Sequence, residues 1–276
     1  MPAYVMSLDS NAVMSRNEYY LWYKGMYMKY KKSVNSHTQM PDFHHTDSFF
    51  SVSYGQEADI WMKMAEFARA WAYANDIQIR VIPGMISSVA SERQIRTLNY
   101  QFCHLRTLAQ WKGFPDGMEF AYVTKIDTDE QANLLKLFTT ADASPDLYLK
   151  ILFFWHTLVY PSDDDYVAAR YINEHISQFD EISNYIATLH DGTFGNVEND
   201  DIGLYILQHI RHALAHIKRN SGVSLIVDDI RQIHHLDAVT KILKIIAKYK
   251  LDNDFNLNRN ASFDTFHMFQ PEIEFP

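Results

Sequence analysis

The stretch that decides the fold of the second half of the chain is IGLYILQHIRHALAHIKR, residues 202–219. An α-helix turns by about 100° per residue, which separates the apolar from the polar side chains of this stretch. The apolar side holds Ile202, Ile206, Ile210, Ala213, Leu214 and Ile217, and the polar side holds Tyr205, Gln208, His209, Arg211, His212 and His216. The pattern predicts an amphipathic helix over residues 198–219 with a face rich in histidine.

Three more segments of the second half repeat this helical spacing. Ser144 and Pro145 are typical of a helix start, because serine caps the first turn and proline is tolerated within it. The predicted helices cover residues 145–160, 163–190 (with a break near Phe179) and 229–251. Four helices with short connections favour a bundle. We therefore expect an all-α four-helix bundle over residues 144–251 and a C-terminal tail over residues 252–276.

The first half alternates between strand-like and helix-like segments. Alternating or β-branched runs predict strands over residues 48–54, 77–82 and 119–126. Helical spacing predicts helices over residues 57–75, 95–108 and 129–138. Ser15 and Glu18 resemble a capping box, which places another helix over residues 15–33. Residues 1–143 are therefore expected to form a mixed α/β module, and the whole chain an α+β protein.

The composition is typical of a packed globular protein. Apolar residues make up 47% of the 276 residues and charged residues 21%, which excludes collagen-like and low-complexity chains. No apolar run reaches the roughly 18 residues of a membrane span, and the N-terminal sequence has no basic leader before an apolar stretch. Cys103 is the one cysteine, so an internal disulfide and a cysteine-based zinc cluster are excluded. We expect a cytoplasmic protein that does not contact a membrane.

The net charge of −9 argues against a protein that coats nucleic acid through many phosphate contacts. An RNA-processing enzyme remains compatible with it, because the local charge of a site matters more than the total. Residues 16–32 and 231–250 are locally basic, and each is also compatible with a solvated helix face.

Arg211 and His216 form the pair best suited to catalysis. On an α-helix they lie about 140° apart, and a long guanidinium and an imidazole can still converge on one phosphate, above all in a groove between two protomers. Imidazole titrates in the range needed to take a proton from a ribose 2′-hydroxyl or give one to the leaving 5′-oxygen. A planar guanidinium can hold the extra negative charge of the phosphorane. The pair predicts RNA cleavage that requires no metal and no cofactor.

The order Arg211-His212-x-x-x-His216 on the third long helix of a bundle resembles the motif of the HEPN superfamily. That superfamily includes nuclease domains of toxin–antitoxin systems, abortive-infection proteins and CRISPR-associated ribonucleases. The resemblance covers residues 145–251. It implies a metal-independent endoribonuclease site built across a homodimer, with Arg211 as ligand of the transition-state phosphate, His216 as general acid/base and His212 as an orienting residue. Lys218 stands where one branch of the family carries a tyrosine that is nucleotidylated.

The resemblance also implies a role in toxicity or anti-phage defence, with RNA as substrate and an antitoxin or other regulator as partner. An acidic side chain of the second helix would assist the site, and Glu174 and Asp180 are equal candidates. A bundle whose motif is inactive, and which serves as a binding module, is the first alternative.

A second feature is compatible with such a binding module. Aromatic residues are interleaved with lysines in the N-terminal segment, which contains Tyr19, Tyr20, Trp22, Tyr23, Tyr27, Tyr30, Lys24, Lys29, Lys31 and Lys32. Aromatic rings can stack on unpaired bases while lysines contact phosphates. The same residues are equally compatible with a partner-binding surface or with a helix that packs on a sheet.

Two metal-dependent sites are further alternatives on the third helix. His212 and His216 have the i, i+4 spacing of a zinc protease helix, but Ala213 stands where the general base of that motif is found. A site that uses His209 together with these two histidines is also open, because the three share one helical strip.

His190-Asp191 resembles the paired residues of the all-helical HD phosphohydrolases. Such a set of imidazoles and carboxylates binds divalent metals that activate water. His156 and either Asp228 or Asp229 would complete it. Gly192, which follows Asp191, is instead typical of a helix end.

Overall fold

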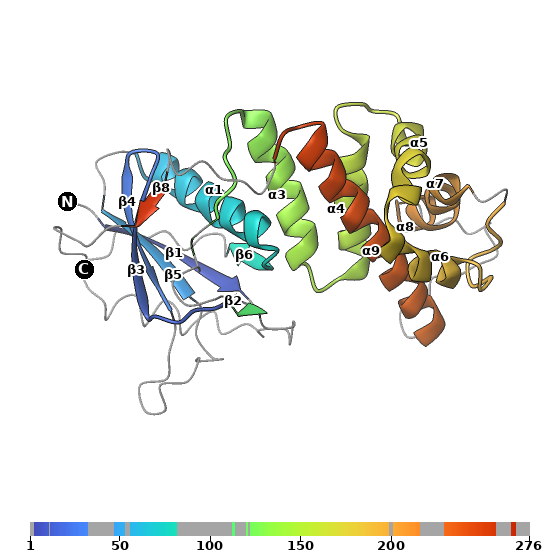
Figure 1. Ribbon diagram of the computed structural model, residues 1–276, viewed down its shortest axis with the longest axis horizontal. Coiled ribbons are helices and arrows are strands. Elements are labelled where there is room, and N and C mark those ends of the chain that lie inside the picture. Colours follow the sequence, from blue (N-terminus) through green and yellow to red (C-terminus); the bar gives the residue numbers. More distant parts are fainter. Residues whose placement is uncertain are drawn as a thin grey trace. The chain divides into compact units, whose positions relative to one another are not determined.

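The computed structural model describes residues 3–10, 12–32, 47–52, 56–81, 112–113, 120, 122–198, 201–215, 229–257 and 266–268. The chain divides into two compact units, unit 1 with residues 1–139 and 257–276, and unit 2 with residues 140–256. Unit 1 combines a sheet with helices, and the described part of unit 2 is helical (Figure 1). The protein is therefore of the α+β class, as the sequence predicts.

Six of the described strands form one sheet in unit 1, in the order β6-β1-β5-β4-β3-β8, with every neighbouring pair antiparallel. Their bounds are β1 Ala3–Ser10, β3 Glu18–Tyr23, β4 Met26–Lys31, β5 Asp47–Val52, β6 Ile79–Val81 and β8 Phe266–Met268. Two short strands, β2 Ala12–Val13 and β7 Lys112–Gly113, pair in parallel. The strands predicted over 48–54 and 77–82 are confirmed as β5 and β6.

The helix predicted over residues 15–33 is wrong, because this segment is the β3–β4 hairpin. Its two turn residues, Lys24 and Gly25, have φ angles of 46° and 80°, and two successive positive φ angles match the twist of a two-residue hairpin. Along β3 buried residues alternate with half-buried ones. The alternation has the period of two of a strand, which the abundance of aromatic residues concealed.

Helix α1 (Glu57–Asn75) begins and ends where the sequence predicts. It packs on the sheet through aromatic rings, with Trp71 edge-on to Tyr30 at 6.0 Å and stacked on Phe120 at 4.8 Å between centroids. Helix α3 (Asp129–Ala143) extends beyond its predicted end at residue 138. The strand predicted over 119–126 is absent from residues 122–127, and the helix predicted over 95–108 lies outside the described residues.

Unit 2 contains α4 (Leu147–Val159), α5 (Asp165–His175), α6 (Ser183–Leu189), α7 (Ile202–Tyr205), α8 (His212–Ala215) and α9 (Ile230–Asn253) (Figure 1). Asp146, not Ser144, caps α4, because its carboxylate accepts hydrogen bonds from the backbone N–H groups of Tyr148 and Leu149. The predicted break near Phe179 is present, since that residue separates two short 3₁₀ turns between α5 and α6.

Helix α9 contributes a buried lysine that caps α4. The ammonium of Lys250 donates to the backbone carbonyls of Leu158 and Tyr160, the latter at 2.7 Å, and lies 5.2 Å from the ring centroid of Tyr171. Burial lowers the pKa of this lysine, against the opposing effect of Asp254. The last carbonyls of a helix lack partners within it, so Lys250 fixes the end of α4 against α9.

The C-terminal tail predicted over residues 252–276 begins later than predicted, and part of it packs on the sheet. Residues 252 and 253 belong to α9, and β8 pairs with β3, where Leu21 lies opposite Met268 and Tyr23 opposite Phe266. A strand next to β3 satisfies backbone groups that would otherwise remain unpaired at the edge of the sheet. Among the described helices, none combines the length and the apolar character that a membrane crossing requires.

Candidate functional site

Arg211 is held by an acidic residue of α5. Its Nη2 lies 3.1 Å from Oδ2 of Asp165, while the other carboxylate oxygen accepts a hydrogen bond of 2.8 Å from the indole Nε1 of Trp155. The side chains of Arg211 and Asp165 are 16% and 26% exposed. One carboxylate thus links α4 and α5 to the helix that carries the predicted motif.

One N–H donor of the guanidinium is buried without a partner in the described part of the chain. Nε of Arg211 is buried and has no hydrogen-bond partner among the residues that the structure describes. A guanidinium carries five N–H donors in a rigid fork, and a buried donor without an acceptor costs free energy. Asp165 therefore fixes the guanidinium in place, and the side chain as a whole stays 16% exposed.

The motif helix is not α-helical throughout. Residues Ile206–Arg211 form a π-helical segment between α7 and α8, in which hydrogen bonds span five residues and each turn is wider. The angle of about 140° predicted between Arg211 and His216 assumed an α-helix and does not apply across this segment. π-Helical segments are frequent at functional sites.

The structure locates two of the three predicted catalytic residues. Arg211 ends the π-helical segment and the half-buried His212 begins α8. His216 lies outside the described residues, as does Asp228. The arrangement of the complete motif therefore remains a prediction.

The acidic partner of Arg211 is a residue that the sequence analysis missed. Glu174 and Asp180, the predicted candidates, are exposed, and the structure pairs Arg211 with Asp165. The signal was the run Asp163-Asp164-Asp165, which is also typical of a helix start. Asp164 is the N-cap, and its side chain accepts from the backbone N–H of Tyr166. Asp165, one position later, is free to turn inward.

A second hydrogen-bonded chain runs through the same unit. The carboxylate Oδ1 of Asp191 lies 3.2 Å from Nδ1 of His235, whose Nε2 lies 3.0 Å from the hydroxyl of Tyr205. His209 stacks on Tyr205 at 5.1 Å between centroids. Tyr205, which was predicted on the polar face, is buried because His235 satisfies its hydroxyl.

Burial sets the protonation of this chain. Burial lowers the pKa of His235, against the opposing effect of Asp191, and burial also raises the pKa of the Tyr205 hydroxyl. Burial tends to raise the pKa of Asp191, but hydrogen bonds from Thr193 and His235 outweigh it and the pKa is lowered. The chain at neutral pH is a carboxylate, a neutral imidazole and a phenol. Tyr205 and His235 are 3% and 0% exposed, so the chain is an internal support for the motif helix.

The set of residues expected for an HD-type metal site is not brought together. His156 and His190 are exposed, Asp191 binds His235, and Asp229 caps α9 by accepting from the backbone N–H of Arg231. No group of three or more His, Cys, Asp or Glu residues within the described ranges is arranged to hold a metal ion. The three-histidine alternative includes His216, which those ranges do not cover.

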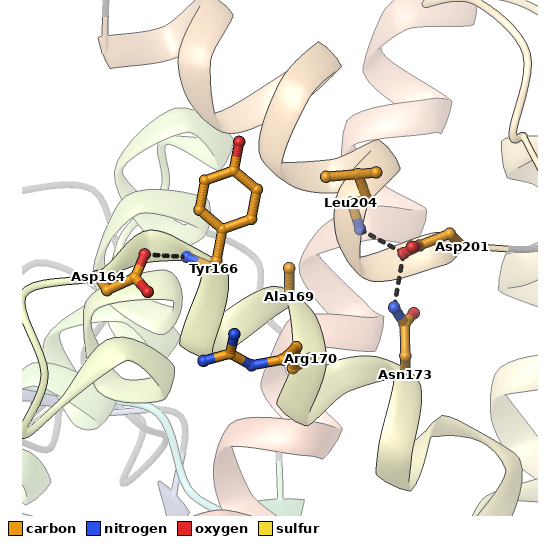
Figure 2. A pocket seen from close by; sticks show the side chains of 7 residues that line it. All are labelled: Asp164, Tyr166, Ala169, Arg170, Asn173, Asp201 and Leu204. Carbon is orange, nitrogen blue, oxygen red and sulfur yellow. Dashed lines mark hydrogen bonds between the residues drawn. The ribbon is translucent and has the colours of Figure 1, made fainter.

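A pocket of about 440 Å³ lies between α5 and α7. It is lined by Asp164, Tyr166, Ala169, Arg170, Asn173, Asp201 and Leu204 (Figure 2). In Figure 2 the guanidinium of Arg170 extends along α5 towards the first turn, where Asp164 and Tyr166 lie. The other wall is fixed by Asp201, which accepts from the backbone of Leu204 at 2.8 Å and from the amide of Asn173 at 2.5 Å.

The two helices that form the pocket approach each other unusually closely. A Cβ atom placed on Gly203 would lie 2.0 Å from the backbone oxygen of Ala169, and the amide oxygen of Asn173 accepts a hydrogen bond of 2.8 Å from the backbone N–H of Gly203. Glycine at this position therefore lets α7 lie directly on α5, which sets the shape of the pocket. The sequence showed Gly203 inside a helical pattern without indicating what it contacts.

The comparisons with known proteins return no similar protein. No family model, no curated protein and no solved structure matches the chain.

Proposed function

We propose that unit 2 is a HEPN-type, metal-independent endoribonuclease that acts as a homodimer. The supporting observation is that Asp165 fixes Arg211, whose side chain remains 16% exposed. A guanidinium held in advance can stabilise developing phosphate charge without reorganising during the reaction. In this proposal Arg211 binds the transition-state phosphate, His216 transfers protons, and His212 orients the two other side chains.

The proposed reaction needs two proton transfers. His216 takes the proton of the ribose 2′-hydroxyl, the 2′-oxygen attacks the adjacent phosphorus, and the bond to the 5′-oxygen breaks as that oxygen gains a proton. The products are a 2′,3′-cyclic phosphate and a 5′-hydroxyl, and no electrons are exchanged with a cofactor. The second His216 of the dimer can supply the second proton. The toxin or anti-phage role comes from the family resemblance alone.

The test is cleavage of a mixed RNA pool by the purified protein in excess EDTA. We expect activity to survive the chelator, and Arg211→Ala and His216→Ala each to lower the rate by about 100-fold or more, the usual loss when one transition-state donor is removed. The matched control is Arg231→Ala, because the Arg231 side chain is 79% exposed and pairs with Asp229 of the same helix end. It should retain wild-type activity, and light scattering should show a dimer.

A binding module with an inactive motif is the second candidate. The observation in its favour is that Asp165 already occupies part of the Arg211 guanidinium, so a phosphate would compete with a carboxylate. A folded dimer that cleaves no RNA and arrests no growth when induced in cells would favour this candidate. Activity that EDTA abolishes would favour a metal site instead.

A further inference from the structure

The pocket between α5 and α7 contains an arginine without an internal role. Arg170 is exposed, and in the part of the chain that the structure describes no hydrogen bond or ion pair involves its side chain. It lines an open surface pocket of about 440 Å³, a volume within the size range of small-ligand sites. The cavity thus presents a planar cation with its donors unused.

An exposed aromatic ring lines the same pocket. Tyr166 is 52% exposed and lies one helical turn before Arg170 on α5, and in Figure 2 its ring extends away from the helix in a different direction from the Arg170 guanidinium. Exposed aromatic rings provide stacking surfaces for unpaired bases, and guanidinium groups bind phosphate through two parallel hydrogen bonds. Ala169 and Leu204 add apolar surface between them. The combination fits a nucleotide.

Two carboxylates face the same cavity. Asp164 uses Oδ1 to cap α5, and Asp201 uses Oδ1 for Leu204 and Asn173. Each Oδ2 has no hydrogen-bond donor among the described residues and can accept one from a ligand. Carboxylates accept from the amino groups of bases, as aspartate does from cytosine. Uracil has no amino group, so it would leave these acceptors less satisfied.

The pocket also shares a helical turn with Asp165, the partner of the proposed catalytic arginine. Asp164 and Tyr166 line the pocket, and Asp165 between them binds Arg211. A polymer with phosphates at regular spacing can engage two such cations at once, which favours RNA over a free nucleotide.

We propose that this pocket is a subsite for one nucleotide of single-stranded RNA whose base carries an amino group. Arg170 binds the phosphate, Tyr166 stacks on the base, and Asp164 and Asp201 accept from the base edge. The inference rests on the proposed ribonuclease function and adds base preference to it.

The test is fluorescence anisotropy with labelled single-stranded RNAs, one of cytidines and one of uridines, on the full-length His216→Ala protein. We expect the cytidine RNA to bind about 10-fold more tightly, which corresponds to one well-made set of base contacts. Arg170→Ala and Tyr166→Ala in this background should each weaken its binding by about 10-fold. Arg231→Ala and Tyr122→Ala are matched controls, since Arg231 and Tyr122 are also exposed and lie outside the pocket. Circular dichroism checks that each variant is folded.

The outcomes separate this inference from the ribonuclease proposal. Equal affinity for both RNAs, or unchanged affinity in Arg170→Ala, overturns the subsite. Cleavage that depends on Arg211 and has an unchanged KM in Tyr166→Ala overturns the subsite and leaves the nuclease in place. Base-selective binding by a protein that never cleaves RNA supports the subsite and overturns the nuclease. Binding of a lysine-rich peptide in place of RNA, lost in Asp164→Asn, would show that the carboxylates recognise a cationic protein partner and would also overturn the subsite.

Discussion

Two arginines of unit 2 lie near one turn of α5 in opposite environments. The Arg211 side chain is only 16% exposed and is bound by Asp165. The indole of Trp155 donates a hydrogen bond to the same carboxylate. Arg170 is exposed, and the described residues supply it with no partner. Desolvation makes the buried charge depend on its carboxylate, whereas the exposed charge can exchange water for a ligand. The fold thus fixes the cation of Arg211, whereas that of Arg170 is available for binding.

The largest effect on stability is expected from Gly203→Ala, which disturbs the close contact between α7 and α5. The new Cβ would lie 2.0 Å from the backbone oxygen of Ala169, and a backbone atom cannot move aside as a flexible side chain can. Helices α5 and α7 must separate, which we expect to lower the free energy of unfolding by about 4 kcal/mol or more. Chemical denaturation followed by circular dichroism measures this.

Gly25→Ala is the matched control for that substitution. Gly25 has a φ of +80° but no atom within 4 Å of the added Cβ, so this variant carries only the conformational cost, about 1 kcal/mol. If the two variants were equally stable, close packing at Gly203 would be excluded as the reason for glycine there.

The second prediction concerns the carboxylate that holds Arg211. Asp165→Ala removes the partner of a mostly buried guanidinium and of the Trp155 indole, so we expect a loss of roughly 3 kcal/mol, near the lower limit for a broken buried pair because both groups retain some exposure. The control is Asp163→Ala, a neighbouring exposed acid, which should change stability by less than about 0.5 kcal/mol. Equal losses from both variants would mean that the ion pair contributes nothing beyond the charge of an acid near the start of α5.

The secondary structure of the chain could be predicted from the sequence only in part. The helices α1, α4 and α9 follow from the spacing of apolar residues, since burial of one face alone produces that spacing. The β3–β4 hairpin was mistaken for a helix because Ser15 and Glu18 resemble a capping box. Only pairing with β5 and β8 decides between the two, and strand pairing is not encoded locally.

The sequence indicates only part of the candidate site. Arg211 stands out by its chemistry and by its spacing from His216, and its catalytic role remains a prediction. Asp165 was missed because the choice among three successive aspartates depends on which one faces Trp155. The pocket could not be predicted at all, since Arg170 and Asp201 are 31 positions apart and line one pocket only because Gly203 lets α7 approach α5.

The third prediction uses pH to weaken the support of the motif helix. Burial holds the pKa of His235 below its ordinary value of 6.5, so the unfolded chain binds a proton before the folded one does. Stability is therefore intact above pH 6.5 and falls as the pH drops below it. The lowered pKa of Asp191 adds a loss in the same direction at more acidic pH, below its ordinary 3.8. We expect the denaturation midpoint to decrease from pH 7 to pH 5.

His235→Gln provides the comparison for this pH series. Glutamine can still bond to Tyr205 but does not titrate, so the variant should start less stable and lose less between pH 7 and pH 5. A wild-type protein whose midpoint is constant over that range would contradict a neutral, buried imidazole.

The smallest effect on stability is expected from Arg170→Ala. Its exposed side chain lacks a partner in the described structure, so the free energy of unfolding should change by less than about 0.5 kcal/mol, in contrast to the loss from Asp165→Ala. A thermal melt in low and high salt measures it, because removing a cation that lies near Asp164 and Asp201 would matter only when charges are poorly screened. A loss of unfolding free energy above about 1 kcal/mol at both salt concentrations would show that Arg170, like Arg211, stabilises the fold. Arg170 would then no longer be a cation that is available for a ligand.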